Sequence, residues 1–303
     1  MSEGATVDRR VQGEPLLLAF SPCPNDTYLF HAWVSGGLPG APTVTPRLED
    51  IDTLNSLALA GRPDVAKISF NALARVRERY ALLHSGGALG RGCGPLLVVR
   101  EDSLLGRGGR GSGDGGSEGS FAGVRIAIPG PLTTATLLLR LFAPTATALV
   151  TLTYDRIMPA VEAGEVDAGL IIHESRFTYP DHRLRALVDL GAWWEETTGH
   201  PIPLGCIVVR RSLGRETAAA VDRTVRRSLE AARRDPIAAG PYIRSHAQEM
   251  EAAVCEAHIA LYVTDFSLDY GPEGEAAIRH LMAAAERSGA VPPGATPLFW
   301  DED

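Results

Sequence analysis

The sequence DRIMPAVEAGEVDAGLIIH at residues 155–173 repeats the pattern of DTLNSLALAGRPDVAKIS at residues 52–69. Each stretch begins with an aspartate that can cap a helix, Asp52 or Asp155, and closes that helix with Ala-Gly. Each then passes through another aspartate into a short apolar strand. One such unit could arise by chance, but two of them predict two α/β lobes of the same kind.

The chain before these units also begins with a predicted strand that leads through a loop into a helix. Residues 16–20, LLLAF, form a continuous apolar run, as expected of a strand buried on both faces. The two prolines of residues 21–25, SPCPN, end that strand. Asn25 or Asp26 can then cap a helix that begins near Thr27.

Two further strands mark where the chain changes lobes. Residues 93–100 and 203–210 are both apolar runs closed by arginine, and we interpret them as the two crossover strands. Lobe one is then predicted to hold residues 16–95 and 206–303, and lobe two residues 96–205. Inside lobe two, the glycine-rich residues 106–119 are expected to form a flexible insertion.

Composition and residue patterns argue against nucleic-acid binding, a cysteine–histidine metal site and a membrane protein. The chain has 303 residues, 45% of them hydrophobic, and a formal net charge of −8 without a basic block. Such a chain is a poor candidate for binding nucleic acid. Its four cysteines show no CxxC pair and no metal-ligand spacing with histidine. No signal-like or membrane-spanning stretch is apparent, so we expect a cytoplasmic protein that contacts no membrane.

His173 is the strongest candidate for chemistry. It follows the apolar strand at residues 166–172, and therefore stands at the strand end where open α/β sheets bind ligands. An imidazole is an efficient proton acceptor near neutral pH. The alternative is a loop histidine held by a backbone carbonyl. Glu174 comes next, but neighbours in an extended chain face different sides, so we do not expect the two to form a dyad.

Two other segments can bind a ligand. Thr133 and Thr134 open a helix after a strand and a turn, and offer hydroxyls and free N–H groups to a carboxylate or a sugar hydroxyl. Lys67, Ile68 and Ser69 end the lobe-one strand and are expected across the cleft from His173. For Thr133 and Ser69, helix capping is the competing interpretation.

The loop after the first strand is less specific. Asn25 and Asp26 can contact a ligand or cap the following helix. Cys23 has no nearby partner in sequence and lies between prolines, which argues against a nucleophile.

Six blocks of the sequence belong together: residues 21–27, residues 48–50 with 53–55, residues 67–69, residues 85–90, residues 133–134 and residues 172–179. Taken in order, they resemble the 1,4-dihydroxy-6-naphthoate synthases of the futalosine route to menaquinone. The similarity runs from about Leu16 to about Arg210 and continues more weakly to the end. The glycine-rich insertion departs from the family's compact form.

The resemblance implies a two-lobed fold of the periplasmic-binding-protein type (type II), with a ligand cleft between the lobes. It implies a lyase that converts cyclic dehypoxanthinyl futalosine to 1,4-dihydroxy-6-naphthoate and a sugar-derived fragment, with no metal and no organic cofactor. His173 matches the proton acceptor. Substrate-binding positions are matched by Lys67, Ile68, Ser69, Thr133 and Thr134. The sequence leaves the oligomeric state open.

Two other functions remain as alternatives. One is a chorismate dehydratase of the same pathway and fold. Residues 21–27 and 173–176 favour the synthase over this dehydratase. The other is a non-catalytic small-molecule binding protein, which would normally carry an export signal or a lipid-attachment cysteine near its start.

Overall fold

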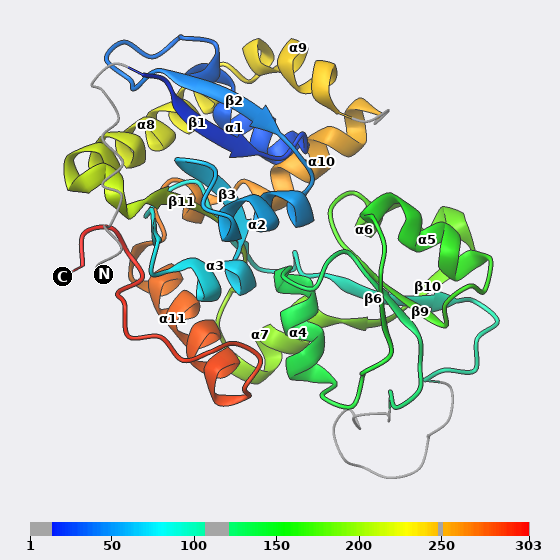
Figure 1. Cartoon of the computed structure of the whole chain (residues 1–303). Helices are drawn as coiled ribbons and strands as arrows, with labels where there is room; N and C mark the ends of the chain where they lie inside the picture. Colours follow the sequence, from blue (N-terminus) through cyan, green and yellow to red (C-terminus); the bar gives the residue numbers. More distant parts are fainter. Residues whose placement is uncertain (1–13, 107–120, 248–250, 303) are drawn as a thin grey trace.

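The computed structural model describes residues 14–106, 121–247 and 251–302, and these form two β-sheets with helices packed around them. Figure 1 shows the sheets side by side, with β1–β3 in one and β6, β9 and β10 in the other. The glycine-rich insertion predicted at residues 106–119 falls, except for Gly106, outside the described residues.

The first sheet is built mainly from the N-terminal part of the chain. Its strand order is β2-β1-β3-β11-β4, and β5 also pairs with β11. The first three strands are parallel, whereas β11 runs antiparallel to its neighbours. The strands are β1 (Leu16–Phe20), β2 (Val44–Leu48), β3 (Val65–Ser69), β4 (Tyr80–Leu82), β5 (Ala88–Gly90) and β11 (Ile202–Arg210).

The second sheet has the order β10-β6-β9-β7-β8. Strands β7, β8 and β9 are parallel, and β6 pairs antiparallel with β9 and β10. Both sheets thus combine a parallel core with an antiparallel strand beside it. The strands are β6 (Leu96–Arg100), β7 (Ile126–Ile128), β8 (Leu149–Thr151), β9 (Ala168–Ile171) and β10 (Leu184–Asp189).

Helices follow the parallel strands and cover the sheets (Figure 1). The α-helices are α1 (Pro24–Val34), α2 (Ile51–Leu59), α3 (Phe70–Val76), α4 (Thr134–Phe142), α5 (Tyr154–Glu162), α6 (Ser175–Thr178), α7 (Leu190–Thr198), α8 (Gly214–Arg234), α9 (Pro236–His246), α10 (Ala252–Tyr262) and α11 (Gly271–Arg287). Three 3₁₀ segments complete the described elements: Tyr179–His182, Arg211–Leu213 and Asp265–Ser267.

The two repeated units form the predicted helix-then-strand pairs, α2–β3 and α5–β9, but their caps were predicted wrongly. Asp50, not Asp52, caps α2, and its carboxylate accepts from the backbone N–H groups of Asp52 and Thr53. In the second unit the N-cap is Thr153, with Asp155 inside the first turn. An acidic side chain in the first turn still interacts favourably with the positive helix end. The N-cap and the first turn are therefore hard to tell apart by sequence.

The cap of α1 was also predicted wrongly. The helix begins at Pro24 with Cys23 at the N-cap, so Asn25 and Asp26 lie inside its first turn. Proline suits the first helical position because its missing N–H would have no partner there. Asn25 and Asp26 are thereby freed from capping for other contacts.

Strand β11 changes the predicted lobe boundary. It pairs with β5 at Ile202 and with β4 at Arg210, so it lies in the first sheet along its whole length. The predicted boundary after residue 205 falls inside this strand. Residues 202–205 therefore belong with the first sheet and not with the second.

Buried apolar side chains pack against both faces of each sheet. The largest buried cluster includes Leu54 and Ile68 of the first sheet's layer and Leu97, Leu170 and Trp194 of the second's. In the described part of the chain, no helix is both long and apolar enough to cross a bilayer.

Candidate active site

A cavity of about 90 Å³ lies where the ends of β1, β3 and β9 meet the start of α4. Residues of both sheets line it, and α10 adds side chains from the C-terminal part of the chain. The carboxyl ends of parallel strands are where α/β folds bind ligands. All but one of the predicted site residues line this cavity: Asn25, Asp26, Lys67, Ser69, Thr133, Thr134 and His173.

Ile68 is the exception. Its side chain is fully buried in the apolar cluster beneath the cavity. Successive residues of a strand face opposite sides, so Lys67 and Ser69 face the cavity while Ile68 between them faces the core. The side chain of Ile68 is therefore placed for packing, although its two neighbours reach the site.

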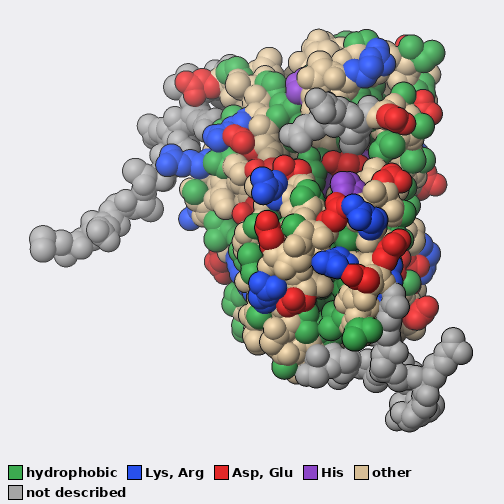
Figure 2. Space-filling model, turned by 90° about the vertical axis from the view of Figure 1, so that its right-hand side faces the viewer, with side chains coloured by type: hydrophobic (Ala, Val, Ile, Leu, Met, Phe, Trp, Pro, Cys, Tyr) green, Lys and Arg blue, Asp and Glu red, His purple; other side chains and the backbone are tan. Residues whose placement is uncertain are grey.

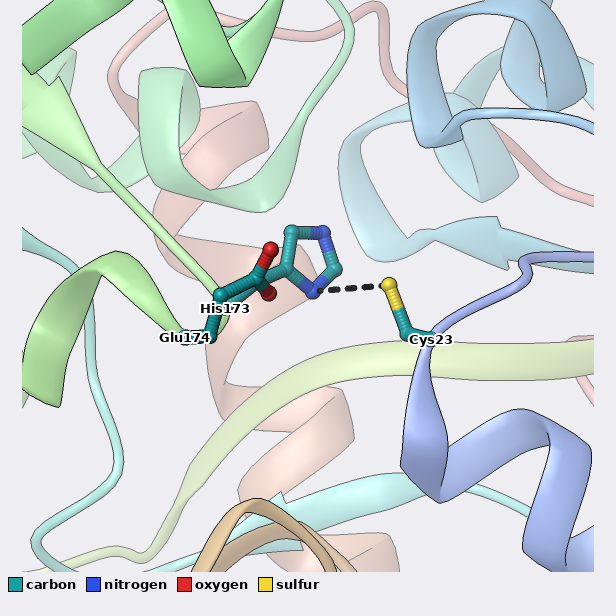
Figure 3. Close-up of side chains that lie close together, drawn as sticks. All are labelled: Cys23, His173 and Glu174. Atoms are coloured by element: carbon teal, nitrogen blue, oxygen red, sulfur yellow. Dashed lines mark hydrogen bonds between the residues drawn. The ribbon is translucent and has the colours of Figure 1, made fainter. Parts of the chain in front are cut away.

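His173 lies just past β9 in an unusual backbone conformation. Its φ is 56°, in the left-handed region that a residue with a side chain rarely adopts. Figure 3 shows its ring directed at Cys23, and the Nδ1–Sγ distance is 3.5 Å. This conformation also corrects the expectation for Glu174, whose carboxylate lies beside the same ring (Figure 3). Alternation fails here because the chain is no longer extended.

The surroundings of His173 favour its neutral form. Burial lowers the pKa of the imidazole, which outweighs the opposing effect of the nearby Glu174 and Asp26 carboxylates; Lys67 lowers it as well. Tyr154 packs edge-on against the ring at 5.6 Å. At neutral pH the ring therefore has a free nitrogen that can accept a proton.

Lys67 forms a buried ion pair with Asp26, with 2.9 Å between Nζ and Oδ1. The other carboxylate oxygen accepts from the hydroxyl of Ser21 at 2.7 Å, and Asn25 Nδ2 donates to Oδ1 at 3.1 Å. A buried charge is tolerated when it is paired and hydrogen-bonded in this way. The ammonium of Lys67 is accordingly already engaged within the protein.

The start of α4 forms the opposite wall of the cavity. Thr133 is its N-cap, and its hydroxyl accepts from the Thr136 N–H. The Thr134 hydroxyl donates to the Leu204 carbonyl at 2.6 Å and accepts from the Phe70 N–H at 3.0 Å, which ties α4 to the first sheet. The N–H groups of the first helical turn have no partner within the helix, so this wall offers donors.

Sequence reasoning missed several side chains of the cavity. His258 and Tyr262 lie on α10, and Ser21 precedes α1. The ring of His258 is parallel to that of His173, with 6.1 Å between centroids and 6° between planes. Neither α10 residue belongs to a motif, because only the tertiary fold brings that helix to the site.

Three side chains around the His173 ring are of the types that bind metal ions. Cys23, His173 and Glu174 each place a possible ligand atom within 4.8 Å of the other two. Thiolate, not thiol, is the form that binds metal ions. Burial raises the pKa of Cys23 well above its ordinary value, and the Glu174 carboxylate raises it further. The protonated thiol is thus the favoured form, as a hydrogen-bond partner of His173.

The surface carries no field of one sign on the face that Figure 2 shows, where basic and acidic side chains are interspersed. Exposed ion pairs of the second sheet illustrate the mixing, among them Arg100–Asp102 and Arg125–Asp167. The cavity, not an extended charged surface, is the feature that suits a ligand.

Comparison with known sequences supports a biosynthetic role. Residues 16–287 match a family described as menaquinone biosynthesis. A 1,4-dihydroxy-6-naphthoate synthase of Thermus thermophilus is 50% identical over 94% of this chain and 99% of its own length. A second, from Streptomyces coelicolor, is 45% identical over 93% of this chain and 96% of its own.

Solved structures show the same architecture. A protein from Archaeoglobus fulgidus superposes with a TM-score of 0.83 at 31% identity, covering 93% of this chain and all of the other. An alkanesulfonate-binding protein of Xanthomonas axonopodis pv. citri has a TM-score of 0.67 at 16% identity, covering 94% and 96%. A Candida albicans protein described as having the generic periplasmic binding protein fold scores 0.63 at 12% identity, covering 93% and 92%.

The more distant structures establish the fold alone, a two-lobed α/β fold of the periplasmic-binding-protein type, as the sequence predicted. The family match and the close sequence relatives establish more than the fold, because they extend over nearly the whole chain. The chain therefore belongs to the menaquinone biosynthesis family, as an enzyme that groups with its 1,4-dihydroxy-6-naphthoate synthases.

Proposed function

We propose that this enzyme is a carbon–carbon lyase that converts cyclic dehypoxanthinyl futalosine to 1,4-dihydroxy-6-naphthoate, with His173 as its base. The observation that carries the proposal is a neutral, half-buried imidazole at the end of β9 that lines the cavity. The names of the two curated relatives support the product.

The base acts through Nε2 in this proposal. The Cys23 sulfur lies next to Nδ1, whereas Nε2 makes no hydrogen bond to the described residues. With the Nδ1 proton donated to sulfur, Nε2 is bare and can accept a proton from the substrate. Loss of that proton and cleavage of one carbon–carbon bond release the sugar-derived fragment. The ring that remains becomes a naphthoate, so aromatic stabilisation favours the products.

The substrate carboxylate is assigned to the start of α4. Two sites were open from the sequence, Lys67 and the Thr133 helix start. The Asp26 carboxylate already neutralises Lys67, whereas the first turn of α4 presents backbone N–H groups that have no partner within the helix and a positive helix end. Lys67 then acts by holding Asp26 and the loop before α1 in place.

The decisive experiment incubates the purified enzyme with cyclic dehypoxanthinyl futalosine and follows product by liquid chromatography and mass spectrometry. Wild type should form dihydroxynaphthoate, and His173→Ala should lose at least about a hundredfold in rate, the usual contribution of a positioned base. Product at wild-type rate from His173→Ala would reject His173 as the base. Tight binding without turnover by wild type would favour a binding protein, and conversion of chorismate instead would favour the dehydratase.

A further inference from the structure

His258 is a buried histidine of the cavity that the proposed base chemistry does not use. It lies on α10 with its side chain fully buried, stacked parallel to His173 on one side. The ring of Tyr262 packs on it at 4.7 Å. Its Nε2 lies 3.0 Å from the Oδ1 atom of Asn25. The orientation of this ring is thus fixed by several contacts.

The neighbouring groups also determine which nitrogen of His258 carries the proton. Asp26 pairs with Lys67 as a carboxylate, which can only accept hydrogen bonds. The Asn25 group that faces Asp26 must therefore be its Nδ2 amide, and its Oδ1 oxygen must face His258. An oxygen acceptor at Nε2 requires Nε2–H. The Nδ1 of the neutral ring is then a bare acceptor.

That acceptor has no hydrogen-bond partner among the described residues, although it is buried. An unpaired buried polar atom has an energetic cost, and such atoms are rare in folded proteins. Burial also lowers the pKa of His258 to about 3, with the His173 ring and Lys67 acting in the same direction, so the ring does not pair by gaining a proton. A donor that satisfies Nδ1 must come from outside the described residues, and His258 lines the cavity where a ligand would bind.

We propose that His258 binds the substrate, by accepting a hydrogen bond at Nδ1 from a hydroxyl of its sugar-derived part. The inference rests on the proposed function and adds a specificity residue to it. An ionised carboxylate has no proton to donate, so Nδ1 selects a hydroxyl, while the N–H groups of α4 take the carboxylate. A hydroxyl held there lies beside the base, since the two ring centres are 6.1 Å apart.

Two substitutions separate substrate binding from packing. In His258→Gln the side-chain amide reaches the Nε2 position and keeps the donor to Asn25, but no acceptor remains at Nδ1. In His258→Asn the shorter amide oxygen stands near Nδ1, and the contact with Asn25 is lost. We expect His258→Gln to lower kcat/KM about tenfold, mostly through KM, as for one neutral hydrogen bond. His258→Asn should stay within about threefold of wild type.

The matched control is His246→Gln, which changes a histidine outside the cavity wall and should leave kinetics unchanged. A larger loss for His258→Asn than for His258→Gln would show that the Asn25 contact matters and would overturn the proposal. Nitrogen-15 NMR of histidine-labelled free enzyme gives a second test, and a proton on Nδ1 of His258 would also overturn it. Dihydroxynaphthoate formation by wild type tests the proposed function separately, because only the ratio between variants reports on His258.

Discussion

At the scale of single residues, His173 differs from the strand before it in backbone as well as in chemistry. A left-handed conformation costs a residue with a side chain about 1 kcal/mol or more, and such residues gather at functional sites. Here the conformation turns the imidazole toward Cys23 and brings Glu174 to the same side. The carboxylate next to the base is therefore a consequence of the local backbone.

Glu174→Gln tests that arrangement. The Glu174 carboxylate raises the pKa of His173 against the larger lowering by burial, so its removal should lower that pKa further. The acid limb of the kcat/KM profile, which reports the free enzyme, should move to lower pH, while the rate near pH 7 falls modestly because the base is weaker. A limb that stays in place would show that Glu174 does not interact with the base. Glu165→Gln, outside the cavity wall, is the control.

At the scale of elements, the sequence predicted strand ends well and side-chain directions less well. The apolar runs placed Lys67 and Ser69 at the end of β3 and His173 past β9, and these meet at one cavity. The same reasoning grouped Ile68 with its neighbours, although the pleat turns it into the core. His258 could not be predicted, because its helix reaches the site only through packing of the distant C-terminal segment.

The start of α4 combines a cap with the assigned carboxylate site, and Thr133→Val tests both roles. Loss of the hydroxyl removes the partner of the Thr136 N–H and should lower the free energy of unfolding by about 1 kcal/mol. KM should rise because the first turn is no longer held in place. Thr133→Ser keeps the hydroxyl and should restore both values. If KM stayed at the wild-type value in Thr133→Val and in Lys67→Ala, the carboxylate would bind elsewhere.

At the scale of the whole molecule, the site exists only where the two sheets come together. We propose that residues 16–95 with 202–303 act as one lobe and residues 96–201 as the other, and that the two close on the substrate; the predicted boundary after residue 205 moves to the start of β11 at Ile202. The hydroxyl of Thr134 bonds groups of the first sheet from the helix that follows β7 of the second. Closure would exclude water from the base and fix the substrate against it.

Two neutral histidines in that interface, the buried His258 and the half-buried His173, make the stability of the whole fold depend on pH. Burial lowers the pKa values of both His173 and His258 in the folded protein, whereas in the unfolded chain each is about 6.5. Below pH 6.5 the unfolded state therefore binds more protons, and the free energy of unfolding should fall as pH decreases, by up to about 1.4 kcal/mol per pH unit for each histidine. Urea unfolding between pH 7.5 and 5 measures the slope, above the range where most carboxylates titrate. His258→Gln should flatten it and His246→Gln should not, whereas equal slopes in wild type and His258→Gln would mean that His258 takes up a proton in the folded enzyme.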